Sequence, residues 1–286
     1  MFFKPTIMKI VSTGSTLSSP EFHEKRKRAR RRRLYWWAAG VFTLLSVLIF
    51  LSRQEKFLVS AVSVEGAKTV NSEMVEAEVK EILSGHYLWL VPRSNFILYP
   101  RREVKSALLN EFPRFSAVDL ELEGSRRLSV LVTEREPYAL YCDSALSPEN
   151  AAACYFLDKE GFIFDSAPSF SGSVYFIYAR ETPLATPLGR AFLPPGEFKP
   201  LSAFIERLEK LGIQPLALEV GADEFNLVLP HDAHLVWKRG SDLDLLYANL
   251  SAFLNDEAIK SQKDFLDRVS TLDLRTENKV FYRFKE

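Results

Sequence analysis

The sequence has few of the residues and motifs that carry enzymatic chemistry. Its 286 residues include only two cysteines and four histidines. It contains no G-x-S-x-G nucleophile motif, no S-x-x-K motif of the penicillin-binding type and no glycine-rich phosphate loop. Acidic pairs such as Asp242 and Asp244 suit a helix start, where the helix dipole favours negative charge. We therefore predict a protein that is not an enzyme and that uses no cofactor and no small-molecule substrate.

The histidines do not form a complete metal-binding pattern. His231 and His234 make an H-x-x-H with Asp232 between them, in a stretch expected to be a turn followed by a strand. The other two, His23 and His86, are distant in the sequence. A metal site needs a third ligand and an open coordination position, and Asp232 is the one nearby candidate. We predict a surface turn and no metal.

One stretch of the sequence is long and apolar enough to cross a membrane. Residues 34–52 are nineteen residues without a charge, and at about 1.5 Å per helical residue they cover roughly the 30 Å of a hydrocarbon core. A cleaved signal peptide is the alternative, but its hydrophobic region is typically only about 7 to 15 residues long. The following SRQEKF also lacks a small-x-small cleavage site. We predict one uncleaved transmembrane helix.

The residues before this helix predict its orientation. Eight of the nine residues 25–33 are basic, and Tyr35, Trp36 and Trp37 follow them. Basic residues are retained on the cytoplasmic side and aromatic rings prefer the membrane interface, so we expect the N-terminus in the cytoplasm and lipid contact through residues 25–52.

Charge is divided unevenly along the chain. Residues 1–33 hold ten basic and two acidic residues, whereas the remainder holds 27 basic and 35 acidic residues, a net charge of −8. Such an acidic region lacks the phosphate-neutralising surface of a nucleic-acid-binding protein. Residues 1–24 are rich in serine and threonine without sustained periodicity, and we expect a flexible tail there. Residues 1–33 would then be the cytoplasmic part.

Cys142 and Cys154 both lie in the region predicted to be outside the cytoplasm. A disulfide that closes this short loop would contribute about 3 kcal/mol in the chain-entropy model. Two buried free thiols are the alternative, and a metal site would need more ligands.

Residues 57–136 have the pattern of a small α+β domain. FLVSAVSVEG predicts a strand, after which Asn71 or Ser72 caps a helix. A second helix is expected from about Arg101 and is stopped by Pro113. Alternating apolar residues in FSAVDLELEG and RLSVLVTERE predict two further strands. The order β-α-α-β-β predicts two helices that cover one face of a three-stranded sheet.

Residues 137–286 predict a mixed, β-rich domain with two helices. CYFLDKEGFIFD predicts a hairpin that turns at Gly161, and SVYFIYAR, LALEV, EFNLVLP and HLVWK predict further strands. Apolar residues keep helical spacing between Phe198 and Leu211 and again from about Asp242. The final VSTLDLRTENKVFYRFKE predicts two extended runs around the TEN turn.

Three stretches carry a resemblance to a known family. VEGAKTVNSEMV, EFPRFSAVDLELEGSRRLSVLVTEREPYAL and YFLDKEGFIFD resemble, in order and spacing, the FtsQ/DivIB bacterial cell-division family. That family has a cytoplasmic tail, one transmembrane helix, a polypeptide-transport-associated (POTRA) domain and a distal β domain. The resemblance assigns these four parts to residues 1–33, 34–52, 57–136 and 137–286.

The resemblance also implies a function and a location. It implies a non-catalytic, single-pass scaffold of the divisome in the plasma (inner) membrane at the division septum. Its extracytoplasmic part would bind FtsB-like and FtsL-like bitopic proteins and help to recruit or regulate septal peptidoglycan synthesis. Residues 67–123 of the POTRA domain would be a second docking surface.

The last stretch of the chain carries the predicted partner site. Leu272–Arg275 resembles the I/V-D-L-R signature that precedes the family's final strand, here Val280–Phe284. An edge strand offers unpaired N–H and C=O groups to a partner's strand, while alternate side chains give specificity. Those side chains are Val280, Tyr282 and Phe284 on one face, or Phe281 and Arg283 on the other. The predicted partner-binding residues are Arg275, Thr276, Asn278, Val280, Phe281, Tyr282, Arg283 and Phe284.

Other interpretations stay open at this point. The aromatic residues of the last strand would, in the simplest alternative, only pack it into its own core. Thr276 also stands where some relatives carry an aromatic residue. A POTRA-containing envelope assembly or secretion factor and a membrane-anchored cell-wall enzyme are the two other functional classes. The first would have a cleaved signal or several POTRA repeats, and the second a polar constellation that the sequence does not reveal.

Overall fold

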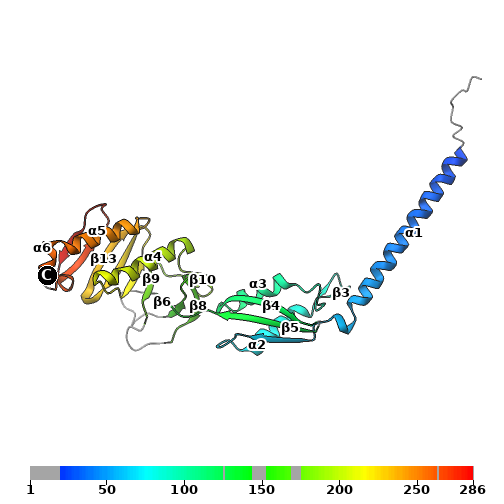
Figure 1. Ribbon diagram of the computed structural model, residues 1–286, viewed down its shortest axis with the longest axis horizontal. Helices are drawn as coiled ribbons and strands as arrows, with labels where there is room; N and C mark the ends of the chain where they lie inside the picture. Colours follow the sequence, from blue (N-terminus) through cyan, green and yellow to red (C-terminus); the bar gives the residue numbers. More distant parts are fainter. Residues whose placement is uncertain (1–19, 125, 144–152, 169–174, 263, 286) are drawn as a thin grey trace, which may run out of the picture.

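The computed structural model describes residues 20–124, 126–143, 153–168, 175–262 and 264–285. It has a mixed α+β architecture in which a long N-terminal helix, a small first domain and a larger second domain follow one another (Figure 1). We call residues 57–136 the first domain and residues 137–285 the second. The long helix and the C-terminal strand lie at opposite ends of this elongated arrangement (Figure 1).

The N-terminal helix α1 (Pro20–Ser52) contains the one span, among the described residues, that is long and apolar enough to cross a membrane. This span is Arg30–Ser52, and the rest of the protein buries none of its most apolar window. The expected apolar N-terminal helix is confirmed and is consistent with a single-pass membrane protein.

The helix begins earlier than expected. It starts at Pro20, so the expectation of a flexible tail is wrong for residues 20–24. Proline suits a first helical turn, and the Glu, Lys and Arg residues after it are good helix formers that extend the apolar helix toward the N-terminus. Residues 1–19 of the expected tail lie outside the described part of the chain.

The first domain combines a three-stranded sheet with two helices. Its elements are the 3-10 turn η1 (Glu55–Phe57), β1 (Ala61–Glu65), α2 (Ser72–Leu83), β2 (His86–Tyr87), β3 (Val91–Pro92), α3 (Arg101–Glu111), β4 (Phe115–Glu123) and β5 (Arg127–Glu134). The sheet order is β1-β5-β4, with β1 parallel and β4 antiparallel to β5. The Asn71 side chain accepts a hydrogen bond from the Glu73 N–H and caps α2. Both helices bury their apolar residues in one core with the sheet.

The sequence pattern missed a short hairpin between the two helices. Strands β2 and β3 pair around the tip Leu88, Trp89 and Leu90. The Leu90 N–H donates to the Tyr87 carbonyl at 3.0 Å, and Leu88 and Trp89 have φ values of 47° and 65°. Two consecutive positive φ values are the geometry of a type I′ turn, which glycine and asparagine usually occupy. Bulky apolar residues give no sequence signal for it.

The second domain is built on one large sheet. Its strands are β6 (Ala139–Cys142), β7 (Cys154–Leu157), β8 (Phe162–Ser166), β9 (Ile177–Arg180), β10 (Arg190–Ala191), β11 (Ala217–Val220), β12 (Glu224–Leu229), β13 (Ala233–Lys238), β14 (Val269–Asp273) and β15 (Phe281–Phe284). They form a ten-stranded sheet in the order β10-β8-β7-β6-β9-β11-β12-β13-β14-β15.

Two helices cover this sheet and bury most of the core. These are α4 (Pro195–Leu208) and α5 (Leu243–Asn255), which run along the same side of the sheet (Figure 1). The Trp237 ring of β13 is fully buried and packs 5.3 Å from the Phe204 ring of α4. The domain also has the short helices α6 (Glu257–Lys260) and α7 (Phe265–Arg268) and the 3-10 turns η3 (Glu209–Leu211) and η4 (Pro230–Asp232). One-turn helices are too short to show periodicity, which is why the sequence predicted only two helices.

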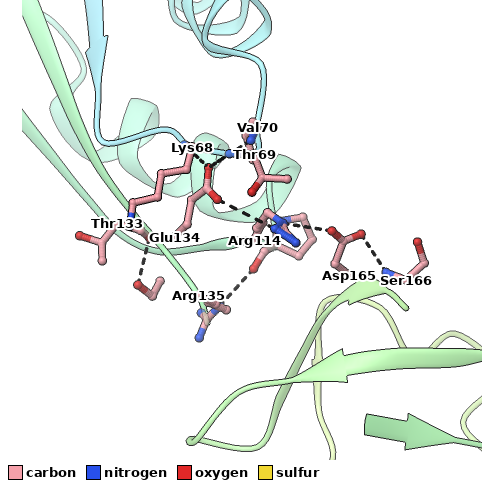
Figure 2. Close-up of polar contacts among 11 residues, drawn as sticks. Lys68, Thr69, Val70, Arg114, Thr133, Glu134, Arg135, Asp165 and Ser166 are labelled. Carbon is pink, nitrogen blue, oxygen red and sulfur yellow. Dashed lines mark hydrogen bonds and ion pairs between the residues drawn. The ribbon is translucent and has the colours of Figure 1, made fainter. Parts of the chain in front are cut away.

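Ion pairs join the two domains at the end of β5. Figure 2 shows Arg114 between two carboxylates: Glu134, which like Arg114 belongs to the first domain, and Asp165, which belongs to β8 of the second domain. The Arg114 Nε donates to Asp165 Oδ2 at 3.0 Å, and its Nη1 lies 3.9 Å from Glu134 Oε2. On the other side, Glu134 Oε1 accepts three backbone N–H groups of residues 68–70 at 2.7, 2.9 and 3.1 Å. The carboxylate thus ties the loop before α2 to the domain junction.

A second arginine reinforces this junction. The Arg135 Nε donates to the Pro113 carbonyl at 3.1 Å, and its Nη1 donates to the buried Asp158 carboxylate. Its guanidinium lies 4.1 Å from the centroid of the Phe162 ring. Asp158 also accepts the Phe162 N–H at 2.8 Å and so fixes the β7–β8 turn. The two arginines therefore connect the first domain to a single hairpin of the second.

Candidate partner-binding edge

The last strand of the chain is the end strand of the large sheet. β15 pairs antiparallel with β14, with Leu272 opposite Tyr282 and Asp273 opposite Phe281. Among the strands that the structure describes, β14 is its one neighbour. In an antiparallel ladder half of the backbone N–H and C=O groups of an end strand point away from its neighbour. This edge is therefore free to accept another strand.

The two faces of β15 differ. Tyr282 and Phe284 point to the helical side, where the Tyr282 ring lies 5.4 Å from the Phe265 ring of α7 and 5.7 Å from the Phe253 ring of α5. Phe281 and Arg283 alternate with them and belong to the opposite face. Phe281 is 53% exposed. An exposed phenylalanine on an open strand is a direct candidate for partner contact.

The simplest alternative, in which the aromatic residues only fill the core, therefore applies in part. Phe284 is half-buried and packs against the main core, and the guanidinium of Arg268 lies 5.0 Å from the centroid of its ring. Val280 packs against the same core. Tyr282 keeps 43% of its surface exposed despite its ring contacts, so it is anchored on one side and accessible on the other.

The turn before β15 is held by one arginine. Arg275 forms a bidentate pair with Asp273, with contacts of 3.0 Å from Nε and 2.7 Å from Nη2, and its Nη1 reaches Glu224 of β12 at 3.1 Å. The hydrogen bond from Arg275 lowers the pKa of the Asp273 carboxyl against the opposing effect of burial. Buried Leu274 anchors the same segment, and its N–H donates to the Val236 carbonyl at 2.8 Å. Arg275 thus acts on the position of the edge and is committed to internal contacts.

Thr276 and Asn278 lie in the exposed turn between β14 and β15. The Lys279 N–H donates to the Thr276 carbonyl at 3.3 Å, and Asn278 has a φ of 57°. Asparagine tolerates this left-handed geometry better than most residues, so its place in the turn has a conformational reason. Of the eight predicted residues, four (Phe281–Phe284) lie in β15 at the edge, and Val280, expected to begin the strand, lies directly before it. The other three lie in the turn.

A pocket beside this turn was not anticipated from the sequence. It has a volume of about 480 Å³ and lies between α5, α6 and the start of β15. Its lining includes Asn249, Phe253, Ile259, Asn278 and Val280. The Phe253 ring is shared between this pocket and the contact with Tyr282. Helical periodicity placed Phe253 on a helix, but only the fold places that helix beside the last strand.

The two histidines of the H-x-x-H pattern have different partners and do not point to a common site. The His234 Nδ1 lies 2.9 Å from the Asn226 Oδ1 of β12, whereas His231, in the turn η4, has its Nε2 3.7 Å from Asp267 Oδ1. Within the described residues, no group of three or more histidine, cysteine, aspartate or glutamate side chains is placed to hold a metal ion.

Cys142 and Cys154 form a disulfide between β6 and β7. The two residues are directly opposite each other in the antiparallel ladder, with a Cα–Cα distance of 4.3 Å. The bond lies six strands away from β15 in the sheet order, so it stabilises the scaffold and takes no part in the edge.

The first domain, where residues 67–123 are the predicted second surface, also has open strand edges. Both β1 and β4 are end strands of its sheet among the described strands. Met74 on α2 is 60% exposed.

No family model matches this chain, and no curated protein matches it.

Proposed function

We propose that this protein is a non-catalytic, membrane-anchored scaffold of bacterial cell division, similar to the FtsQ/DivIB family. In this proposal the N-terminus is cytoplasmic and both domains are outside the cytoplasm, at the division septum. The second domain binds FtsB-like and FtsL-like single-pass proteins, and the assembly recruits or regulates septal peptidoglycan synthesis. The free edge of β15 is the observation on which the proposal depends most.

The order of the elements supports the proposal. A membrane helix is followed by a β-α-α-β-β arrangement, here with a small hairpin between its helices, and then by a large β domain. A POTRA domain is the interpretation that we give to the first of these. The run TEREP, which is part of the resemblance, contains Arg135, which bonds to Asp158 of the second domain, and Glu134, which ties the loop before α2 to the junction.

Strand addition explains how the edge would bind. A partner segment that pairs with β15 gains main-chain hydrogen bonds, while side chains on both faces choose the partner. Phe281 and the exposed Arg283 would contact it on one face, and Arg283 favours a partner with acidic side chains. The exposed part of Tyr282 would contact it on the other, next to the pocket lined by Val280 and Asn278.

The membrane anchor fits this mode of binding. β15 lies at the end of the molecule farthest from α1 (Figure 1), where a single-pass partner with an extended coiled coil can reach it. Because both proteins are held in one membrane, their effective concentration is high and a modest intrinsic affinity is enough. Scaffold proteins of this kind need no active site.

The test is a comparison of two surface variants. Phe281→Lys places a charge on the outward face of β15, and Leu188→Lys makes the same change at a leucine that is 48% exposed in a loop far from the edge. Each full-length variant is purified in detergent from its native host, and co-purifying proteins are identified by mass spectrometry. Far-ultraviolet circular dichroism checks that both remain folded.

We expect small single-pass coiled-coil proteins to accompany the wild type and Leu188→Lys and to be lost from Phe281→Lys. Equal recovery from both variants would move the binding site away from β15. Recovery of outer-membrane assembly or secretion components in place of division proteins would favour the envelope assembly factor instead.

A further inference from the structure

We propose that the tip of the β2–β3 hairpin binds the lipid bilayer at the membrane end of the first domain. The tip is Leu88, Trp89 and Leu90, and we call it the membrane finger. This inference goes beyond the proposed function and depends only on α1 crossing a membrane. It gives the first domain a second attachment to the bilayer in addition to its covalent link to α1.

The membrane finger is fastened to the end of the membrane helix. Arg53, the residue after the apolar span, donates from Nε to the Leu90 carbonyl at 2.8 Å and from Nη2 to the Trp89 carbonyl at 3.1 Å. The hairpin strand β3 lies beside the lower end of α1 (Figure 1). Because one side chain bridges the two, the finger lies at the level where the chain leaves the hydrocarbon core.

The backbone carbonyl groups at the end of α1 are also satisfied in a way that suits an environment with little water. Its last four carbonyls, at residues 49–52, all accept hydrogen bonds from the protein itself. The first three donors are local: the Ser52 hydroxyl and the Arg53 and Gln54 N–H groups. The fourth is the buried Asn95 side chain, which donates from Nδ2 to the Ser52 carbonyl at 3.1 Å. Unsatisfied backbone groups are costly where water is scarce, so this arrangement suits the membrane interface.

Two side chains of the membrane finger, Leu88 and Trp89, are the most exposed large apolar side chains among the described residues. Leu88 is 88% exposed and Trp89 is 89% exposed. Two further exposed apolar residues, Ile97 and Leu98, follow Asn95 in the neighbouring segment at 70% and 51%. Isolated exposed leucines are common, but a cluster of large apolar residues marks an interaction surface.

The backbone of the membrane finger adds an independent observation. Leu88 and Trp89 adopt the left-handed conformation that a type I′ turn requires, although glycine or asparagine would adopt it with less strain. Strained positions are retained where they serve a function. A turn that holds two bulky apolar side chains away from the protein is suited to inserting them into a lipid bilayer.

The bilayer is the occupant that the surroundings favour. The candidate span Arg30–Ser52 begins with four arginines. Its uncharged part, residues 34–52, is about 28 Å long at about 1.5 Å per residue and matches the hydrocarbon core, which places Ser52 at the boundary of that core. Tryptophan is enriched at this level because its ring is apolar and its N–H is polar. The guanidinium of Arg53, held against the finger by its two hydrogen bonds, places a positive charge at the same level, where the headgroups lie. A soluble partner protein would have to compete with the bilayer for the membrane finger, because α1 already holds the finger next to the lipid.

The experiment measures the depth of Trp89 in a bilayer. The full-length chain is prepared with Trp36→Phe and Trp37→Phe, which leaves Trp89 and the fully buried Trp237 as emitters. A parallel sample that also carries Trp89→Phe gives the Trp237 signal for subtraction. Both are reconstituted alone in phosphatidylcholine/phosphatidylglycerol nanodiscs, with or without acyl-brominated phosphatidylcholine, and are titrated with aqueous iodide.

A matched control places tryptophan at an exposed site of the same domain. Met74→Trp is introduced into the chain that carries Phe at positions 36, 37 and 89. Met74 is 60% exposed near the start of α2, shortly after the loop that is bonded to Glu134 at the domain junction. Its tryptophan should be quenched by iodide and unaffected by brominated lipid.

We expect brominated lipid to remove most of the Trp89 emission, and iodide to have little effect on it. Its emission should also lie at shorter wavelength than that of the control. Quenching of Trp89 by iodide alone would mean that the membrane finger lies in water and would overturn the proposal. Protection from both quenchers would mean that protein covers the finger, and this result would overturn it as well.

Discussion

Replacing Glu134 with glutamine tests how one buried carboxylate holds the domain junction. Glu134 Oε1 accepts three backbone N–H groups within 3.1 Å, and its side chain is only 8% exposed. A hydrogen bond to a charged acceptor contributes about 1 kcal/mol more than one to a neutral acceptor. Because the three bonds converge on one oxygen, they are not additive, and we expect Glu134→Gln to lower the stability of the first domain by about 2 kcal/mol.

The same structure predicts how this loss depends on pH. Burial raises the pKa of Glu134, but the backbone N–H donors of residues 68–70 outweigh burial and bring the pKa below its ordinary value of 4.5. A carboxyl whose pKa is lower in the folded protein stabilises the fold above the ordinary pKa. This contribution disappears as the pH falls below 4.5 through the folded-state pKa. The difference between wild type and Glu134→Gln should therefore be full at neutral pH and shrink in acid.

Hydrogen exchange followed by mass spectrometry gives a local measurement. A loss of about 2 kcal/mol corresponds to a roughly 30-fold faster exchange of the amides at residues 68–70, if they exchange by opening of this domain. Glu136→Gln is the matched control, because it makes the same charge change two residues further on at an exposed position. It should change stability by less than about 0.5 kcal/mol. Equal exchange in wild type and Glu134→Gln, or a difference that is independent of pH, would refute the reasoning.

Three further predictions concern the second domain. Gly161→Ala should lower its stability by about 3 kcal/mol in denaturant unfolding, because Gly161 has a φ of +81° and an added Cβ would lie 2.6 Å from the Phe198 ring. The matched change Gly212→Ala should lower stability by only about 1 kcal/mol, because Gly212 has a φ of +78° but no atom lies within 4 Å of the added Cβ. Similar losses of stability in Gly161→Ala and Gly212→Ala would contradict the steric argument. Burial first, and then the Glu206 carboxylate, raise the pKa of Tyr138 above its ordinary 10.0. The contribution of Tyr138 to stability should therefore fade as the pH rises above 10.0, and wild type should lose stability more steeply there than Tyr138→Phe. Parallel stability curves for the two proteins would contradict this. Reduction of the β6–β7 disulfide, which joins residues 12 apart, should lower the unfolding free energy by about 3 kcal/mol, and an unchanged denaturation midpoint under reducing conditions would contradict this.

Periodicity predicted those elements whose burial repeats along the chain. Val75, Val79 and Leu83 recur on one side of α2 and are all buried. Alternation in the same way predicted β4 and β5, where Val118 and Leu120 face the core. These elements carry their pattern locally, because one side of each faces the core throughout its length. The apolar helix α1 was predictable for a related reason, since its whole surface is apolar over the width of a membrane.

The contacts that give the candidate site its properties depend on distant residues. The sequence identified the last strand and its aromatic residues but left open which face would be outward. Packing of Tyr282 on Phe253 and Phe265 decides this, and Phe281 is left as the outward residue. Arg275 was predicted as a contact residue, whereas its bonds to Asp273 and Glu224 show a role in holding the turn.

The sequence by itself determined the long apolar N-terminal helix, the order of most helices and strands, and the position of the last strand in the chain. Each of these is recorded in a local repeat of apolar residues or in a short run of charge. The tertiary structure alone decided that β15 is an end strand, that Arg114 joins two domains, and that Leu88 and Trp89 are held beside the end of α1. These features arise from pairings between residues far apart in the sequence, and no local pattern specifies such pairings, because their energy exists only after the chain has folded.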